Sequence, residues 1–249
     1  MAAIIEIQGL TKIYGLGEVT VRALENVTLT IEHGSFVAVM GASGCGKSTL
    51  MNLLGCLDRP TSGRYWLDGV AVEGLDRDQL ASIRNQKIGF VFQNFNLLPR
   101  MSAMENAQLP LLYASGDTGD ADARVRRALA LVGLAGREHS LPTQLSGGQQ
   151  QRIAIARALI NDPEILLADE PTGQLDSRTS AEIMGIFQQL NRRKGITIVV
   201  VTHSDEVARY ASRIITFRDG RVIRDNRNPS LPTGDAEPAH LPAELEAAP

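Results

Sequence analysis

The chain has 249 residues, of which 43% are hydrophobic and 21% are charged, and its formal net charge is −3. This composition is typical of a folded α/β domain with a sizeable core, and it gives no general attraction for nucleic acid. Two cysteines, Cys45 and Cys56, are too few for a disulfide framework or a zinc site, which favours a reducing compartment. The N-terminus lacks a signal-peptide pattern, and no apolar run approaches the length of a membrane span. We therefore expect any membrane role to come through a partner.

Two segments near the N-terminus alternate apolar and polar residues, which predicts half-buried strands at residues 4–10 and 27–31. Tyr14 lies between them. Its ring could stack on an adenine base, or it could be a packed loop tyrosine, and the local sequence alone favours the second interpretation.

A glycine-rich loop follows the apolar strand predicted at residues 36–40. Gly41, Gly46, Lys47 and Ser48 fit the phosphate-loop pattern G-x-x-x-x-G-K-[ST]. Glycines let the backbone approach a ligand closely, and the amide groups at the start of the next helix attract anions. In this pattern the lysine reaches the β- and γ-phosphates and the serine hydroxyl binds Mg²⁺. The loop therefore predicts nucleotide binding.

The helix that begins at Lys47 has an apolar face made of Leu50, Leu53, Leu54 and Leu57. A hairpin, a polar helix and an apolar strand are predicted next, at residues 64–72, 76–85 and 88–92. Gln93 directly follows that strand. It could hold Mg²⁺ or a water molecule, although a simple polar residue at a strand end is the commoner interpretation.

A second element suited to anions begins at Ser146. Ser146 to Gln149 precede a helix predicted at residues 150–160. Ser146 is a good helix N-cap, and the paired glycines Gly147 and Gly148 leave amide groups exposed. Plain helix capping is the alternative. Upstream, Ser102 and Glu105 predict a capping box, and residues 121–132 predict an amphipathic helix.

Two carboxylates, Asp169 and Glu170, end the apolar strand predicted at residues 165–168. Carboxylates at the end of a buried strand are costly unless positive charge opposes them, and a Mg²⁺–nucleotide complex supplies that charge. Asp169 is therefore the expected metal ligand, and Glu170 is the expected base for an attacking water. Asp176 then caps a helix predicted to run to about residue 193.

The last predicted strand of the core, at residues 196–201, is β-branched almost throughout, as in a parallel strand buried on both faces. His203 follows it. A lone histidine is usually structural, but ligands gather at such strand ends, so a hydrogen bond to a γ-phosphate is plausible. A closing hairpin is predicted at residues 214–223, and residues 226–249 are predicted to form a disordered tail.

Taken together, these elements resemble the nucleotide-binding subunit of an ATP-binding cassette (ABC) transporter. The corresponding motifs are Tyr14 for adenine stacking, GASGCGKST as Walker A, Gln93 as the Q-loop, LSGGQ as the signature, ILLADE as Walker B, Leu175-Asp176 as the D-loop and His203 as the switch histidine. The resemblance implies an α/β P-loop ATPase core over residues 4–225. It also implies an N-terminal antiparallel β subdomain and an inserted helical subdomain at about residues 94–160.

The resemblance also implies a mechanism in which two copies meet head to tail around two ATP molecules. Each ATP would lie between the Walker A loop of one copy and the signature of the other, and Asp176 would lie close to the nucleotide. The implied metal ligands are Ser48, Gln93 and Asp169, and the implied catalytic residues are Glu170, His203 and Gln93. The implied nucleotide-binding residues of the two segments are Gly41, Ala42, Ser43, Gly44, Cys45, Gly46, Lys47, Ser48, Thr49, Ser146, Gly147, Gly148 and Gln149.

Several segments are most similar to MacB-type macrolide exporters and the related lipoprotein-release (LolD-type) ATPases, among them GEVTVRALENV and DEPTGQLD. In that group the ATPase drives a permease, often with a periplasmic adaptor and an outer-membrane channel. This implies a location on the cytoplasmic face of the inner membrane, with residues 94–105 taking the coupling helix of the permease. A lipoprotein-release or cell-division ATPase remains the alternative.

Two residues depart from the pattern. Cys45 replaces the usual serine of the loop, and its place at a helix N-terminus beside Lys47 suggests an oxidation-sensitive switch. Gln174 stands where the group more often has asparagine, which puts communication between the two ATP sites in doubt but not hydrolysis. A DNA-repair or translation ATPase would have a second cassette, a coiled-coil insertion or a basic face, and a non-catalytic nucleotide binder would lack Glu170.

Overall fold

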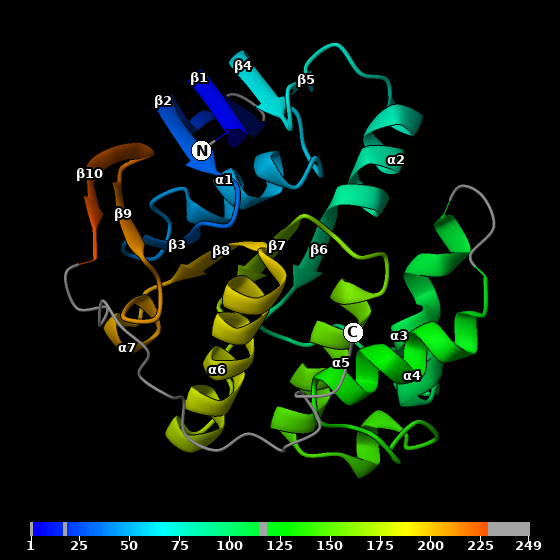
Figure 1. The fold of residues 1–249 in the computed structure, drawn as a ribbon. Coiled ribbons are helices and arrows are strands. Elements are labelled where there is room, and N and C mark those ends of the chain that lie inside the picture. Colours follow the sequence, from blue (N-terminus) through cyan, green and yellow to red (C-terminus); the bar gives the residue numbers. More distant parts are fainter. Residues whose placement is uncertain (1, 17–18, 115–118, 229–249) are drawn as a thin grey trace.

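The computed structural model describes residues 2–16, 19–114 and 119–228, and within them it contains two sheets with helices around them (Figure 1). The larger sheet has the strand order β10-β9-β3-β8-β7-β6. Strands β3, β6, β7, β8 and β9 of this sheet run parallel, and β10 pairs with β9 in the antiparallel direction. The strand bounds are β3 Phe36–Met40, β6 Ile88–Val91, β7 Ile165–Asp169, β8 Thr197–Thr202, β9 Arg213–Arg218 and β10 Arg221–Arg227.

The smaller sheet is antiparallel, with the order β2-β1-β4-β5, and it comes from the N-terminal part of the chain. Its bounds are β1 Ala3–Leu16, β2 Val19–Glu32, β4 Ser62–Leu67 and β5 Val70–Ala71. The long β1–β2 hairpin contains several register shifts, which bend it. Together the two sheets agree with the predicted α/β class and with an N-terminal antiparallel β region.

Several of the described helices begin at side-chain caps that the sequence provides. The side chains of Asp76, Ser102, Ser146 and Asp176 each accept a hydrogen bond from the backbone N–H three residues later. The bounds are α1 Lys47–Leu54, α2 Arg77–Lys87, α3 Ala103–Gln108, η1 Leu109–Tyr113, α4 Ala121–Leu131, η2 Pro142–Gln144, α5 Gly147–Leu159, α6 Ser177–Lys194 and α7 Asp205–Ala208. Among the described residues, none of these helices combines the length and the apolar character needed to cross a bilayer.

The central strands are buried on both faces, because alternate side chains enter two different cores. In β3, Phe36 and Ala38 pack into one core, whereas Val37 and Val39 pack into the other. Helices α3 to α6 cover the first face, and α1 lies on the second face beside the antiparallel sheet (Figure 1). The phosphate-loop helix α1 and the helix α5 that starts after Ser146 therefore lie on opposite faces of one sheet.

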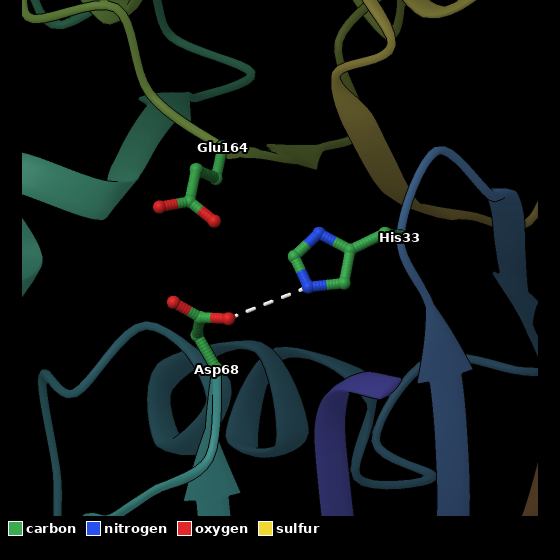
Figure 2. A group of neighbouring side chains, drawn as sticks. All are labelled: His33, Asp68 and Glu164. Atoms are coloured by element: carbon green, nitrogen blue, oxygen red, sulfur yellow. Dashed lines mark ion pairs between the residues drawn. The ribbon is translucent and has the colours of Figure 1, made fainter. Parts of the chain in front are cut away.

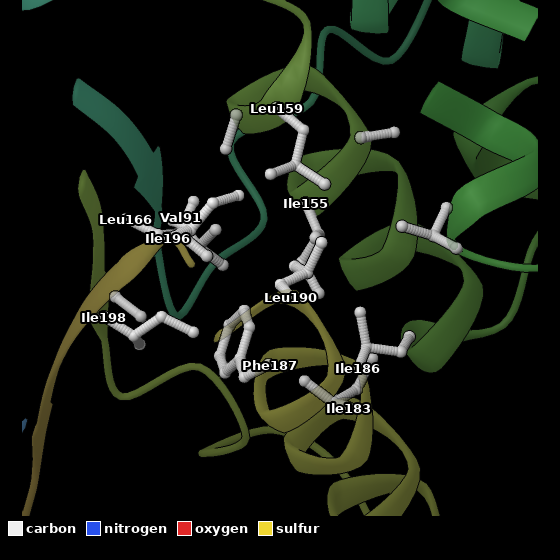
Figure 3. Packing of buried hydrophobic residues seen from close by; sticks show 14 of the residues in the cluster. Val91, Ile155, Leu159, Leu166, Ile183, Ile186, Phe187, Leu190, Ile196 and Ile198 are labelled. Atoms are coloured by element: carbon white, nitrogen blue, oxygen red, sulfur yellow. The ribbon is translucent and has the colours of Figure 1, made fainter. Parts of the chain in front are cut away.

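The core on the α5 and α6 side is closed by the aromatic ring of Phe187. Figure 3 shows this ring between Ile198 of β8 and the aliphatic side chains of its own helix α6. Phe187 and Ile198 are both fully buried. Because α6 starts directly after Asp176, this packing fixes the direction in which the segment after β7 leaves the sheet.

A polar cluster joins the antiparallel sheet to the central sheet at the end where β7 begins. Figure 2 shows His33, Asp68 and Glu164 facing one another. Lys87 Nζ contacts Asp68 Oδ2 at 2.5 Å and Glu164 Oε1 at 2.7 Å, so a lysine already supplies the positive charge that these carboxylates need. The hydrogen bond from Lys87 is the main cause that lowers the pKa of Asp68.

The structure corrects two expectations from the sequence. Leu57 does not continue the apolar face of α1, because the helix ends at Leu54 before Gly55, and Leu57 is 48% exposed. The predicted tail starts too early at Asn226, because Asn226 and Arg227 pair with β9 as the last residues of β10. The rest of that tail, from residue 229, lies outside the described residues.

Phe187→Ala should lower the free energy of unfolding by about 3–5 kcal/mol, because it removes a fully buried ring and leaves a cavity. Urea unfolding without nucleotide measures this. Leu112→Ala is the control, since Leu112 is 71% exposed and its loss should change stability by less than about 0.5 kcal/mol. If Phe187→Ala lowers the free energy of unfolding by less than about 1 kcal/mol, the ring of Phe187 does not contribute to this core as the structure indicates.

Candidate active site

The loop between β3 and α1 depends on glycine. Gly41, Gly44 and Gly46 have φ angles of 155°, 78° and 103°, a region that residues with a Cβ rarely adopt. Space is short as well, since a Cβ on Gly46 would lie 2.4 Å from the carbonyl oxygen of Ala23, and one on Gly41 would lie 2.4 Å from that of Phe217. The loop is therefore folded tightly against β2 and β9.

Lys47 is held inside this loop and is only 8% exposed. Its Nζ donates hydrogen bonds to the carbonyl oxygens of Gly41 at 2.7 Å and Ala42 at 2.8 Å. Cys45 Sγ lies 3.9 Å from the same nitrogen, and Cys45 is 6% exposed. An oxidant would thus reach Cys45 only after the loop moves, and the proposed redox switch stays a prediction.

A pocket of about 390 Å³ opens beside the loop. Five of the predicted binding residues line it, namely Gly44, Gly46, Lys47, Ser48 and Thr49. Its opposite wall was missed from the sequence and consists of Val21, Arg22, Ala23, Asp219 and Gly220. The wall comes from the β1–β2 hairpin and the β9–β10 turn, which no local motif connects with the phosphate loop.

Tyr14 lies within β1, paired with Val21 of the pocket wall, rather than in a loop between two strands. Its hydroxyl donates a hydrogen bond to Asp58 Oδ2 at 2.8 Å, and Lys12 Nζ lies 4.8 Å from the ring centroid. Partial burial, followed by the hydrogen bond and charge of Asp58, raises the pKa of Tyr14. The ring is thus held firmly near the pocket, and adenine stacking stays a prediction.

The two carboxylates at the end of β7 have different surroundings. Burial, followed by the nearby charge of Glu170, raises the pKa of Asp169, while Lys47 and a hydrogen bond with Ser48 act in the opposite direction. The structure therefore brings together Asp169, Ser48 and Lys47. A carboxylate and a hydroxyl are hard oxygen donors of the kind that Mg²⁺ prefers, so the donor set fits this ion.

Glu170 is turned toward the end of β8. Its φ angle of 43° is unusual for a residue with a Cβ, and its backbone N–H donates to the carbonyl oxygen of Val201 at 2.9 Å. His203 Nδ1 lies 2.6 Å from Glu170 Oε1, so the two predicted catalytic residues are in direct contact. The hydroxyl of Thr202 also contacts Glu170, at 3.0 Å, and sequence reasoning did not single out this residue.

Gln93 follows β6 and lies against the loop after Glu170. A Cβ on Gly173 would be 2.8 Å from the side-chain nitrogen of Gln93, which shows how closely the two loops pack. Gln174 Nε2 donates to Asn94 Oδ1 at 2.6 Å and joins the same two loops. The residue that departs from the expected asparagine therefore has a partner within its own chain.

The segment Ser146–Gln149 forms a reciprocal capping box. Ser146 Oγ accepts from the N–H of Gln149 at 3.3 Å, and Gln149 Oε1 accepts from the N–H of Ser146 at 3.0 Å. Asp176 caps α6, and both of its carboxylate oxygens accept from Thr179. Because α1 and α5 pack into different cores, the two anion-binding elements of one chain begin helices on opposite faces of the sheet.

The sequence model of the ABC transporter family matches residues 24–173, a range that includes the phosphate loop, Ser146–Gln149 and Glu170. The chain belongs to the ABC transporter family. In this ABC ATPase the matched range contains both anion-binding elements and the two carboxylates at the end of β7.

Named relatives point to one group of ABC proteins. The macrolide export ATP-binding/permease protein MacB of Syntrophobacter fumaroxidans is 57% identical over 221 residues, which are 88% of this chain and 31% of the relative. The ABC transporter ATP-binding protein MJ0796 of Methanocaldococcus jannaschii is 49% identical over 227 residues, which are 90% of this chain and 97% of the relative. This ABC ATPase thus spans about a third of the length of its MacB relative.

Solved structures of MJ0796 have the same fold. A dimeric structure of a post-hydrolysis state bound to ADP and Pi has a TM-score of 0.84 at 46% sequence identity, and it covers 91% of this chain and 100% of that one. A second dimeric structure of MJ0796 gives the same TM-score at 47% identity. The fold of this ABC ATPase is therefore one that has been observed as a dimer with hydrolysis products.

Gly46→Ala should weaken nucleotide binding at least about tenfold, because the added Cβ meets the carbonyl oxygen of Ala23 and the φ angle of 103° is strained. Titration with ATP by calorimetry measures this. Gly69→Ala is a matched control, since Gly69 has a φ angle of 74° but its Cβ would meet no atom within 4 Å. Equal affinities for both variants would contradict the tight loop.

Proposed function

We propose that this chain is the ATP-hydrolysing component of a MacB-type exporter and that it works as a head-to-tail pair. The MacB relative from Syntrophobacter fumaroxidans supports export over the lipoprotein-release or cell-division alternative. Similar proteins from Hyphomonas neptunium and Escherichia coli, each 51% identical, are also macrolide export ATP-binding/permease proteins. On this proposal the chain acts through a permease.

The observation that carries the proposal is that the helices starting at the two anion-binding elements lie on opposite faces of the central sheet. The loop Gly41–Thr49 and the segment Ser146–Gln149 belong to helices α1 and α5, which pack into different cores. A second copy turned head to tail presents its Ser146 segment to the phosphates held by the first copy. Two copies then enclose two ATP molecules, and neither copy completes a site alone.

At each site the phosphates of ATP are bound by the amide groups of the loop and by Lys47. Lys47 then exchanges its two carbonyl partners, Gly41 and Ala42, for phosphate oxygens. Ser48, Asp169 and Gln93 are the proposed ligands of Mg²⁺, which neutralises charge on the β- and γ-phosphates. Tyr14 stacks on the adenine, and Asp176 lies at the interface between copies.

Hydrolysis requires a base for the attacking water. Glu170 takes the proton from this water while the oxygen attacks the γ-phosphorus and the bond to ADP breaks. His203 contacts Glu170 at 2.6 Å, and its side chain is 69% exposed, so it is free to turn toward the γ-phosphate. Charge repulsion between ADP and phosphate then favours opening of the pair, which is the step that moves the permease.

A groove beside β6 is the proposed docking site of the permease. Its volume is about 490 Å³, and its walls come from α2, β6, η1 and α5, with apolar residues such as Phe90, Leu109 and Tyr113. Asn96, from the predicted contact segment at residues 94–105, also lines it. Arg157 donates to the carbonyl oxygens of Phe95 and Asn96, at 2.8 Å and 2.6 Å, and so links the groove to α5.

Docking in this groove places the chain at the membrane surface. The proposed partners are therefore a second copy of this chain and a MacB-type permease, with a periplasmic adaptor and an outer-membrane channel completing the exporter. The proposed location is the cytoplasmic face of the inner membrane.

Glu170→Gln should bind ATP normally but hydrolyse it at least about a hundredfold more slowly, the usual scale for loss of a general base. It should also accumulate as closed dimers with ATP, since hydrolysis opens the pair. Phosphate release and light scattering measure the two effects. Glu164→Gln, far from the phosphate loop, is the control, and near-normal turnover by Glu170→Gln would remove Glu170 from this role.

Tyr113→Glu should reduce binding to the proposed MacB-type permease at least about tenfold, because it puts a charge on an apolar groove wall. ATP hydrolysis by the chain alone should stay unchanged. Tyr113 is 77% exposed, so the fold should tolerate the change, and Ile223→Glu is the control at another site, 50% exposed. Normal co-purification of Tyr113→Glu with the permease would place the docking surface elsewhere.

A further inference from the structure

Thr202, the last residue of β8, connects the proposed base with the interior of the fold. It is 1% exposed, and its side-chain oxygen takes part in two hydrogen bonds. The backbone N–H of Ser204 donates to this oxygen at 3.0 Å. The hydroxyl itself donates to Glu170 Oε2 at 3.0 Å.

In its hydrogen bond with Glu170, the hydroxyl of Thr202 must be the donor. A hydroxyl has one proton, a backbone N–H can only donate, and an ionised carboxylate can only accept. Because the carboxylate has no proton to give, the hydroxyl proton of Thr202 is directed toward Glu170, while its oxygen accepts from Ser204. Thr202 is therefore a donor that is fixed in place before nucleotide binds.

The two oxygens of Glu170 have partners of different mobility. His203, at Oε1, is on the surface, and its side chain is 69% exposed. Thr202, at Oε2, is buried in the central sheet and held by the backbone. If His203 turns toward the γ-phosphate, Oε1 loses its partner and becomes available to a water, while Oε2 stays bound.

We propose that Thr202 is a positioning residue that holds Glu170 for hydrolysis. It binds Oε2, so the carboxylate keeps one orientation, and Oε1 is the atom that receives the proton from the attacking water. The φ angle of 43° at Glu170 is held by the backbone hydrogen bond to Val201, and Thr202 then fixes the side chain that this backbone directs toward β8. This inference rests on the proposed role of Glu170 as the base.

The competing explanation is purely structural: the hydroxyl only satisfies the N–H of Ser204 and so stabilises the start of α7. That role would change stability without a specific effect on the chemical step. A comparison of kcat with the KM for ATP separates the two, because positioning of the base affects turnover and not nucleotide binding.

Thr202→Val should lower kcat about tenfold or more with the KM for ATP changed less than twofold, since a misplaced base loses much of its effect. Thr202→Ser keeps the hydroxyl and should restore most of the rate. Thr197→Val is the matched control in the same strand. Thr197 is fully buried and its hydroxyl accepts from the N–H of Gly34 at 3.0 Å, at the other end of β8, so kcat should be unaffected.

The same change in a Glu170→Gln background separates this inference from the function it rests on. There Thr202→Val should not slow the residual single-turnover rate further, because no base remains to be positioned. Full turnover by Glu170→Gln itself would refute the role of Glu170. The role of Thr202 would be refuted by any of three results. These are a wild-type kcat in Thr202→Val, an equal loss of rate from this change with Glu170 and with Gln at position 170, or a kcat that Thr202→Ser does not restore. Thermal melting confirms that each variant is folded, and Thr202→Ala replaces any Thr202→Val protein that is not.

Discussion

Burial of the parallel strands on both faces is the constraint from which the site follows. Side chains of β3, β7 and β8 alternate between two apolar cores, so these strands have no room for charged groups along their length. Polar residues therefore stand where the strands end. Parallel strands end at the same edge of a sheet, and three polar groups gather at that edge here. They are the phosphate loop after β3, the carboxylates at the end of β7, and Thr202 and His203 at the end of β8. A regular parallel sheet is therefore enough to bring these groups close together, and no contact between distant loops is required.

The same two-sided sheet also accounts for the proposed pairing of two chains. Helix α1 needs one apolar face and helix α5 needs the other, so a single chain keeps its two anion-binding elements apart. Completing a site within one chain would require one helix to leave its core, at the cost of its buried side chains. Pairing of two copies avoids that cost. The solved structures of MJ0796, which are dimeric, are consistent with this reasoning.

The parts of the site that could be predicted from sequence are those set by local chemistry. The glycines around Lys47, the caps at Ser146 and Asp176, and the carboxylates at the end of β7 are all recognisable within a few residues. Each of them satisfies a nearby backbone group or a charged ligand. Residues that reach the pocket only through the pairing of strands far apart in the sequence could not be predicted. Val21 and Asp219 reach the pocket through a bent hairpin and a turn, and nothing in their neighbours indicates it. The apolar periodicity gave a wrong prediction for Leu57, because α1 ends at Leu54 before Gly55 and so does not reach Leu57.

The central claim is that a triphosphate bound by one copy is enclosed by another. The most direct test is a structure of the Glu170→Gln variant with ATP and Mg²⁺. The account predicts amide groups of Ser146–Gln149 from one copy within hydrogen-bond distance of the γ-phosphate bound at Lys47 of its partner. Ser146–Gln149 facing solvent, away from every phosphate in every assembly present, would contradict it.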